Sequence, residues 1–227
     1  MLRKISILSL AFFLAGSAAT HAEVYVGARY GAGLSMMFFS PHQNEKKGIT
    51  PLNAAIAFRY CNSEAQDYER YMNLMIELAY GMRGYSMETR PIVSSDTTAG
   101  ATATRTSHVL ELPLVMQAHI PLYKNFKLLV TGVAYGAYYL KNTQKYEVGG
   151  QRVKETFSYD NFNGFEYGVG GGLGFGLSMG KTDFAIDARY TASMSYLYKP
   201  TATQTRFLYE SMPMQVIISF SVMRKIF

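Results

Sequence analysis

The chain has 227 residues, of which 48% are hydrophobic, 14% aromatic and 17% charged. This length fits one domain or two small ones, and the composition is too apolar and too poor in charge for a disordered chain. Beyond the N-terminal segment no apolar run reaches the roughly 18 residues of a membrane helix, which excludes a helical membrane protein. Because Cys61 is the single cysteine, an intrachain disulfide and a cysteine-based zinc site are excluded as well.

The N-terminal segment has the pattern of an export signal. Arg3 and Lys4 form a short positive region, and the stretch from Ile5 to Ala19 is apolar. Thr20-His21-Ala22 then places small residues before a cleavage point. We therefore predict cleavage before Glu23 and export to the periplasm, the outer membrane or the medium. A single membrane anchor is disfavoured because the apolar stretch is shorter than the roughly 20 residues that a spanning helix needs.

The charge of the mature chain is mild. The whole sequence has a net charge of +6, and loss of Arg3 and Lys4 with the signal lowers it to +4. The charged residues are scattered through the sequence and form no basic blocks, so we expect no binding to nucleic acid.

The mature sequence has one dominant period, which is two residues. From Glu23 to Phe38 the even-numbered positions are apolar, whereas the odd-numbered positions include Glu23, Arg29 and three glycines. Alternation over so many residues predicts a β-strand with one apolar and one polar face. Eight segments show this pattern: Glu23–Phe38, Leu52–Tyr60, Met72–Arg83, Leu110–Ile120, Leu128–Leu140, Phe165–Met179, Phe184–Tyr198 and Met212–Val222.

Strand length and loop pattern favour a membrane barrel over a soluble one. The apolar faces of the eight segments contain no Asp, Glu, Lys or Arg, but alternation alone fits a soluble barrel equally well. Most segments, however, reach the roughly 9–11 residues of a bilayer-spanning strand. Tight connections at 121–125 and 180–181 alternate with long ones at 84–107 and 142–164, as periplasmic turns alternate with extracellular loops.

The predicted fold is therefore all-β, a closed antiparallel eight-stranded transmembrane β-barrel of the outer-membrane type. Residues 1–22 form the cleaved signal peptide and residues 23–227 form the barrel domain. A ten-stranded barrel is the alternative, with Lys145–Val148 and Gln151–Glu155 as an added hairpin around two glycines. We interpret this hairpin as an extracellular extension.

The polar faces predict a filled interior. Eight strands enclose a space that side chains just fill, so we expect a packed polar core with a salt-bridge network instead of a water-filled pore. The residues predicted for this network are Arg29, Arg59, Glu77, Glu111, Glu166, Asp187 and Arg189. On the outer face we expect an interfacial girdle of aromatic residues at or near the strand ends, formed by Tyr30, Tyr60, Tyr80, Tyr138, Tyr167, Tyr190 and Tyr196.

Several motifs resemble chemical sites, but their context disfavours this. Gly180-Lys181-Thr182 ends like a phosphate-binding loop, yet Phe175 stands where the first glycine belongs and no helical pattern follows. His119 shares the inner face of its strand with Glu111 and has no nucleophile nearby, so we interpret it as a lumen residue. Ser107 and His108 are adjacent and point to opposite faces. We predict no catalytic residues, no metal site and no cofactor.

Two local features depart from a regular barrel strand. Pro113 removes a backbone donor from a sheet without edges, so we expect a β-bulge there. Phe227 is at an odd position, whereas the apolar face of the last segment is even, so Met223–Phe227 is predicted to form a short tail.

Three stretches carry a family resemblance. Val109-Leu110-Glu111-Leu112-Pro113-Leu114, the segment Gly132–Tyr139 and Asp187-Ala188-Arg189-Tyr190 together resemble the small outer-membrane β-barrel (porin-like, PorT-like) family of the Bacteroidota. The resemblance covers essentially the whole mature chain and implies an eight-stranded barrel in the outer membrane of a Gram-negative bacterium. It matches Glu111 and Pro113 to the acidic-x-proline position of the family. Such barrels serve as anchors or as parts of secretion systems, so the resemblance is weak for function.

The sequence favours a non-enzymatic barrel with a structural, surface-interaction or secretion-assembly role. The first alternative is a passive small-solute channel, which needs an open lumen. The second is a lipid-modifying barrel enzyme, for which only His108 near Ser107 or Thr106 is available. The expected partners are outer-membrane lipids and lipopolysaccharide, with an envelope or secretion-system protein as a further candidate, and the barrel is expected to be a monomer.

The signal-peptide assignment predicts the first residue of the mature protein. N-terminal sequencing of the protein from the cell envelope should begin at Glu23 because the small residues before it fit the cleavage site. A mature chain that still begins at Met1 would contradict the assignment.

Overall fold

The computed structural model describes residues 22–40, 46–62, 72–89, 101–148, 151–156, 163–197 and 210–227. The predicted signal peptide, apart from its last residue, lies outside these ranges. Ten strands are present: β1 (Ala22–Ser40), β2 (Lys46–Gly48), β3 (Leu52–Asn62), β4 (Met72–Thr89), β5 (Ala101–Tyr123), β6 (Phe126–Val148), β7 (Gln151–Thr156), β8 (Phe165–Met179), β9 (Thr182–Ser193) and β10 (Glu210–Lys225). Within the described ranges no helix is long and apolar enough to span a bilayer.

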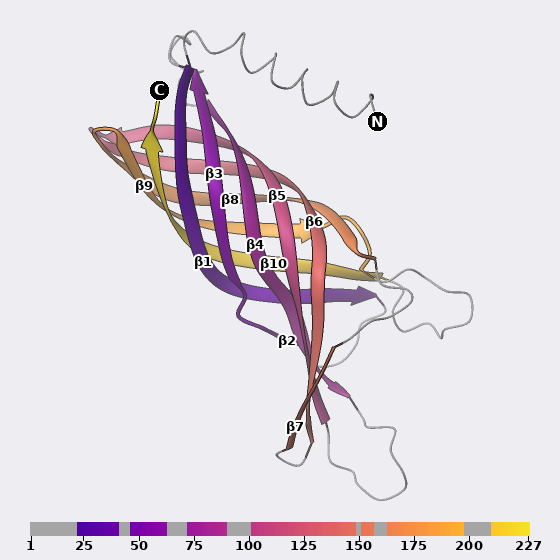
Figure 1. Ribbon diagram of the computed structural model, residues 1–227. Helices are drawn as coiled ribbons and strands as arrows, with labels where there is room; N and C mark the ends of the chain where they lie inside the picture. The colour runs from indigo at the N-terminus through magenta and orange to yellow at the C-terminus, as the bar shows by residue number, and fades with distance from the viewer. Residues whose placement is uncertain are drawn as a thin grey trace, which may run out of the picture.

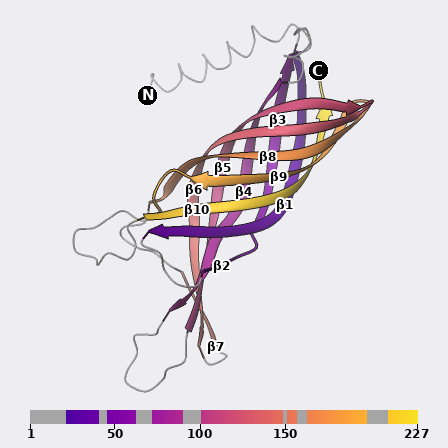
Figure 2. The ribbon, with the colours of Figure 1, turned by 180° about the vertical axis from the view of Figure 1, so that it is seen from behind.

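Eight of the strands close into a ring, which confirms the predicted fold (Figures 1 and 2). The order around the ring is β1, β3, β4, β5, β6, β8, β9 and β10, and β10 pairs with β1 to close it. Every pairing is antiparallel. β2 pairs with β4 and β7 pairs with β6 outside this ring, so the ten-stranded alternative is wrong. The hairpin formed by the end of β6 and β7 is an extension of the barrel, as predicted.

The start of β1, the C-terminus and the tight turns lie at one end of the barrel, the upper end in Figure 1. The turn at Lys124 and Asn125 joins β5 to β6, and the turn at Gly180 and Lys181 joins β8 to β9. Gly180 has a φ of 62°, a left-handed conformation that glycine adopts without strain. Since tight turns are periplasmic in bacterial outer-membrane barrels, this is the periplasmic end and the opposite end is extracellular.

The register around the ring gives the stagger of the barrel. From Tyr30 of β1, the row of paired residues through β3, β4, β5 and β6 reaches β8 at Phe165. The row that runs the other way through β10 and β9 reaches β8 at Phe175, ten residues further along. Such a stagger tilts the strands, typically by about 35–45° from the barrel axis, and eight strands then enclose an interior that side chains can just fill.

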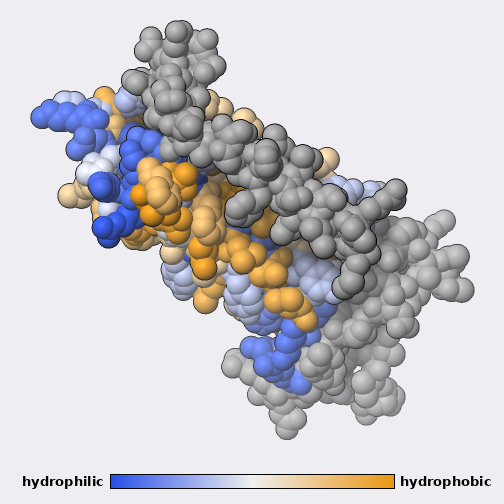
Figure 3. Space-filling model, turned by 45° about the horizontal axis from the view of Figure 1, so that its top comes forward, coloured by the Kyte–Doolittle hydropathy of each residue, from blue (hydrophilic) through white to orange (hydrophobic). Residues whose placement is uncertain are grey.

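The two faces of the strands divide as the alternation predicts. On β4, Leu74, Ile76 and Leu78 are exposed on the outer face, whereas Met75 and Glu77 between them are buried. The same exposed-and-buried alternation runs along β3, β5 and β8. In Figure 3 the middle of the visible face is mostly hydrophobic, and hydrophilic side chains gather toward both of its ends. The outer face is thus an apolar band that fits the hydrocarbon core of a bilayer.

The strands β4, β5 and β6 continue well past this band at the extracellular end. β4 has no partner in β3 beyond Gly81, yet it stays paired with β5 up to Thr89. We call residues 82–89, 101–108 and 141–148, together with β2 and β7, the extracellular ribbon; it projects at the bottom of Figure 1. The sequence pattern predicts long connections here, with one hairpin extension at Lys145–Glu155. The outward face of the ribbon carries polar residues such as Ser86, Thr104 and Lys145, so its strands lack the apolar outer face that lipid imposes on the barrel.

Pro113 causes no bulge, contrary to the expectation. β5 stays in register with β6 at Pro113. Toward β4 the pairing lapses between Ile76 and Ala79 and then resumes in the same register. Because proline lacks an N–H, the ladder loses a bond on one side without needing an extra residue. A register shift between β5 and β6 lies instead between His108 and Val109.

The last two strands, β9 and β10, also end at other residues than predicted. β10 runs to Lys225, and the backbone N–H of Ile226 still donates to Val24 at 2.8 Å, so Met223–Phe227 is not a separate tail. β9 ends at Ser193, earlier than predicted, because the Ser193 and Ser195 hydroxyls bond to nearby backbone and interrupt the regular ladder.

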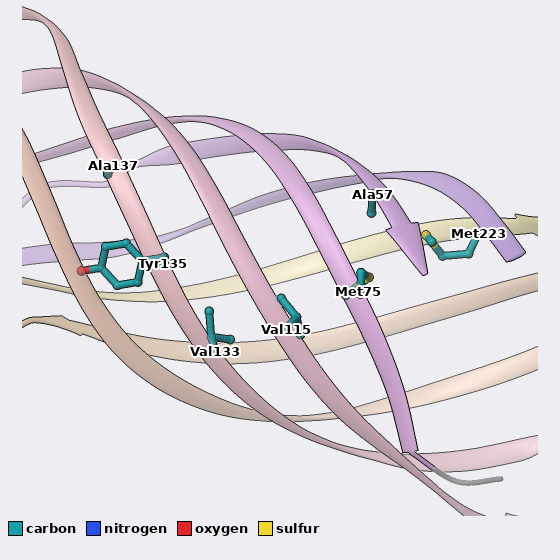
Figure 4. Close-up of a cluster of buried hydrophobic side chains, with 7 residues drawn as sticks. All are labelled: Ala57, Met75, Val115, Val133, Tyr135, Ala137 and Met223. Atoms are coloured by element: carbon teal, nitrogen blue, oxygen red, sulfur yellow. The ribbon is translucent and has the colours of Figure 1, made fainter. Parts of the chain in front are cut away.

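The lumen contains apolar as well as polar side chains. Figure 4 shows a cluster that points inward from five strands, β3, β4, β5, β6 and β10: Ala57, Met75, Val115, Val133, Tyr135, Ala137 and Met223. The sequence pattern predicts a packed polar core, without this apolar cluster. Lipid excludes charge from the outer face, but the closed interior accepts either kind of side chain as long as polar groups are paired.

Inward glycines on β8 make room for large neighbours. A Cβ at Gly168 would come within 2.2 Å of the backbone oxygen of Ala192 on β9 and within 2.6 Å of Tyr135 Oη. By contrast, Gly132 on β6 faces outward, and a Cβ there would find its nearest atom, a backbone oxygen, at 4.0 Å. The glycine face of β8 therefore shapes the lumen.

This difference predicts opposite results for two matched substitutions. Gly168→Ala should destabilise the barrel by about 1–3 kcal/mol because the methyl group overpacks against the backbone oxygen of Ala192 and the side chain of Tyr135. Gly132→Ala should leave stability unchanged or slightly raised, since the added methyl group enters open space. The midpoint temperature in heat-modifiability gels measures both, and equal midpoints would contradict the packing argument.

Candidate functional site

A closed circuit of polar contacts crosses the middle of the barrel. Arg29 Nη2 donates to Glu77 Oε2 at 2.8 Å, and Arg189 Nη1 donates to Glu77 Oε1 at 2.8 Å. Arg189 also forms an ion pair with Asp187. The Ser219 hydroxyl donates to Asp187 Oδ1 at 2.7 Å and accepts from Arg29 Nη1 at 3.3 Å, which completes the circuit. We call these five residues the central circuit.

The central circuit joins opposite walls of the barrel. Glu77 lies on β4 and Arg189 on β9, and three strands separate β4 from β9 in either direction around the ring. Glu77 is 0% exposed, and its carboxylate is held by two guanidinium groups. A buried carboxylate without partners would be strongly unfavourable, so each arginine is required to offset the burial of this group. The circuit carries two positive and two negative charges.

A second cluster lies toward the extracellular end, around Arg83. Its guanidinium forms ion pairs with Glu111, at 3.0 Å between Nη2 and Oε1, and with Glu166. Tyr135 donates to Glu166 Oε1 at 2.7 Å, and Tyr139 donates to the other carboxylate oxygen of Glu166. The Arg83 guanidinium also lies 4.8 Å from the centre of the Tyr135 ring, a cation–π contact. One cation and two tyrosine hydroxyls thus hold two carboxylates.

A third cluster lies toward the periplasmic end, around Asp183. Arg59 forms an ion pair with Asp183, and the Ser178 hydroxyl donates to the same carboxylate at 2.7 Å. Lys127 Nζ lies 4.0 Å from Asp183 Oδ2. The Arg59 guanidinium lies 4.0 Å from the centre of the Tyr25 ring. The three clusters together fill successive levels of the lumen.

The structure places all seven predicted network residues inside the barrel. Four lie in the central circuit, Glu111 and Glu166 lie around Arg83, and Arg59 pairs with Asp183. The prediction omits Arg83 and Asp183, which organise two of the three clusters. The sequence does place both on the inner face, because residues an even number of positions apart on a strand share a face: Arg83 follows Glu77 by six residues, and Asp183 precedes Asp187 by four.

The cavities that the described residues line in the lumen are small. One lies between the central circuit and the Asp183 cluster, with a volume of about 20 Å³. A second, of about 30 Å³, lies between the central circuit and the Arg83 cluster. A third, of about 20 Å³, lies at the extracellular mouth beside Tyr139 and Arg105. Each has room for roughly one or two water molecules.

The seven predicted girdle tyrosines all lie on the outer face and are exposed. Tyr80 and Tyr138 lie where the outer face changes from apolar residues to the polar ribbon. Tyr60, Tyr167 and Tyr190 lie within three residues of a strand end, and Tyr196 lies beyond β9. Tyr30 departs from the expectation because it lies inside β1, with Leu34, Met36 and Phe38 exposed further toward the extracellular end.

The candidate chemical residues have structural partners. His108 Nδ1 lies 2.7 Å from Tyr80 Oη on the outer face, and the two rings stack at 5.9 Å. Ser107 lines the cavity at the extracellular mouth, so it points away from His108. His119 Nε2 lies 2.7 Å from Gln117 Oε1 inside the lumen. Among the described residues no group of three or more His, Cys, Asp or Glu is placed to hold a metal ion.

Loss of a central-circuit residue should destabilise the barrel. Glu77→Ala leaves two arginines facing an empty space, and Arg189→Ala leaves Glu77 and Asp187 with fewer partners, so each should cost about 3–5 kcal/mol. Glu23→Ala is the matched control, because the Glu23–Lys225 pair at the periplasmic rim is about one-third exposed and should be worth at most about 1 kcal/mol.

Heat-modifiability gels with the protein in lipid vesicles measure all three variants. If Glu77→Ala and Arg189→Ala melted like the wild type, the central circuit would not hold the barrel together.

Comparison with known proteins assigns the chain to a family. The family model described as outer membrane protein beta-barrel domain matches residues 18–199. No curated protein sequence matches. Solved structures that are similar to the chain include Neisserial surface protein A (NspA), with 13% identity, a TM-score of 0.43, and coverage of 90% of this chain and 99% of that one. OprG from Pseudomonas aeruginosa has 11% identity, a TM-score of 0.41, and coverage of 90% and 95%.

Ail, the attachment invasion locus protein of Yersinia pestis, is similar at 12% identity and a TM-score of 0.36, with coverage of 88% of this chain and 99% of that one. The Bacteroidota and PorT-like part of the sequence resemblance stays a prediction. The family model spans most of the chain, and the ring of eight strands has the apolar outer band of a bilayer-spanning barrel. The chain therefore belongs to the outer membrane protein beta-barrel domain family and is a protein of the outer membrane of a Gram-negative bacterium.

Proposed function

We propose that this protein is a closed, non-enzymatic barrel that anchors the extracellular ribbon in the outer membrane, where the ribbon serves a structural, surface-interaction or secretion-assembly role. The observation that carries this proposal is the central circuit. An ion pair links β4 to β9 across the lumen, so the lumen is closed and the barrel serves as a membrane anchor.

The filled lumen argues against the channel alternative. A passive pore needs a continuous water-filled path, whereas the three lumen cavities described above have volumes of only about 20–30 Å³, and the central circuit separates the periplasmic one from the other two. Buried arginine and carboxylate groups that already pair with one another would gain little stabilisation from binding a solute in the lumen. A hydrated ion would have to displace both partners of a buried pair.

The geometry around His108 argues against the lipid-modifying alternative. A nucleophile–base pair needs the two side chains within hydrogen-bond reach, about 2.6–3.2 Å. The imidazole of His108 instead contacts Tyr80, and Ser107 points into the extracellular mouth. This arrangement supports His108 as part of the aromatic boundary of the membrane band.

The extracellular ribbon supports a role at the cell surface. The paired strands of β4, β5, β6 and β7 continue past the apolar band without a hydrophobic outer face. Inside it, Arg105 donates to Tyr85 Oη at 2.7 Å and to Gln144 Oε1 at 3.2 Å, which ties three strands together. Such cross-strand contacts stabilise a projecting sheet and so favour a defined binding surface over a loose loop.

Conductance in planar bilayers tests the proposal. The purified protein should give no stepwise current at any applied voltage, because the central circuit blocks the lumen. A heat-modifiability gel on the same sample shows that the inserted protein is folded. Reproducible single-channel steps from folded protein would overturn the closed-barrel proposal and favour the channel.

A further inference from the structure

The outward face of the extracellular ribbon carries a continuous row of hydroxyl and lysine residues. The register places Ser86, Thr104, Lys145 and Lys154 side by side on β4, β5, β6 and β7. Residues that are paired across antiparallel strands share a face. Ser86 follows the outward-facing Tyr80 by six residues on β4, so this row continues the lipid-facing side of the barrel.

The two lysines of this row form a like-charge pair. Lys145 and Lys154 lie directly opposite each other, and both are exposed. At such positions the Cβ atoms are about 4.5–5.5 Å apart, and equal charges destabilise the sheet. The lysines with an ion pair in the described part of the chain are Lys127 and Lys225, both at the periplasmic end. An anion bound between Lys145 and Lys154 would remove this repulsion.

The neighbouring rows compensate that positive charge only in part. One row further out, the register aligns Glu88, Thr102, Glu147 and Arg152, a row with two acidic residues and one basic residue against the three lysines. One row further in, it pairs Thr106 with Thr143, which carry no charge. The next row toward the membrane adds the exposed Lys141. The outward side of the ribbon therefore has a net excess of lysine.

The height of these lysines above the apolar band matches the polar layer of the outer leaflet. Lys141 pairs with His108, in the first row beyond Leu110 and Tyr138. At about 3.4 Å per residue, Lys141 lies about 7 Å beyond that band along the strand, and Lys145 lies about 20 Å beyond it. Because the strands tilt, the vertical distances are smaller, and the lysines lie where phosphorylated head groups and their first sugars begin.

The residue types fit a phosphate ligand. Each lysine ammonium offers three donors, and charge-assisted hydrogen bonds to phosphate oxygens are among the strong ones. The Ser86 and Thr104 hydroxyls lie 3.2 Å apart in the same row and can both turn toward an acceptor. The tyrosines below the row provide an amphipathic boundary for the lipid chains.

We propose that Lys141, Lys145 and Lys154, with the hydroxyls of Ser86 and Thr104, bind the phosphate groups of outer-leaflet lipopolysaccharide. This site lies on the outer side of the ribbon and is separate from the lumen. It depends on the place of the barrel in the outer membrane and holds whether or not the lumen conducts.

The test measures binding of rough-type lipopolysaccharide to the purified, detergent-folded protein. The triple variant Lys141→Gln, Lys145→Gln, Lys154→Gln should lose about fivefold in affinity for each lysine, and on the order of a hundredfold in total. The control triple variant Lys124→Gln, Lys181→Gln, Arg224→Gln removes the same charge from exposed residues at the periplasmic end and should bind like the wild type. Both variants are first checked for heat-modifiable folding.

Two further ligands distinguish the source of the anion. The same lipopolysaccharide without its phosphates should bind the wild type as weakly as the intact lipid binds the ribbon variant. Equal losses in the two triple variants would show attraction by overall charge and overturn the proposal. Inorganic phosphate or a deacylated phosphosugar that bound as tightly as the lipid would also overturn it, because the site would then take a soluble anion.

Discussion

The structure depends on one constraint, which is that hydrocarbon cannot accept a charge. A lysine or arginine at the bilayer midplane of a barrel costs about 2–4 kcal/mol, so the lipid-facing positions of the strands are apolar. Alternation then sends the other half of each strand into a closed interior, where the charged residues gather. The interior therefore holds buried charged residues, and each needs an ion pair there to offset its burial, as Glu77, Arg189 and Asp187 have.

Pairing across the lumen has consequences for both mechanics and function. The contact between Glu77 and Arg189 connects strands that the backbone ladder alone does not connect, so it braces the ring across its width. The Arg83 cluster does the same between β4 and β8 nearer the extracellular mouth. A barrel braced in this way is a stable support, which suits an extracellular ribbon that continues from three of its strands. The interior and the ribbon thus have different tasks.

The same constraint explains what could be predicted from the sequence. Lipid acts on every second residue of β3, β4 and β8, so alternation located these strands, and Phe165–Met179 was predicted with the bounds that β8 has. The constraint ends at the edge of the bilayer. Beyond it the outward faces of β5 and β6 carry polar residues, so Ala101–Ser107 was predicted to lie in a loop and Lys145–Val148 in a separate hairpin, although both continue the strands of the barrel.

The interior was predictable by residue type but not by pairing. Parity alone placed Arg59 and Glu111 inside, but their partners depend on the stagger of the ring, which no local pattern contains. The prediction of a β-bulge at Pro113 was wrong because a local gap in the pairing of β5 with β4 accommodates the missing N–H of proline without an extra residue.

A double-mutant cycle between Glu77 and Arg189 tests the central claim most directly. The unfolding free energy in urea is measured in lipid vesicles for the wild type, Glu77→Gln, Arg189→Gln and the double variant. A braced lumen predicts a coupling energy of about 1.5–3 kcal/mol between the two positions, with the double variant closer to either single variant than to their sum. A coupling energy near zero would contradict the account, because the contact across the barrel would then carry none of its stability.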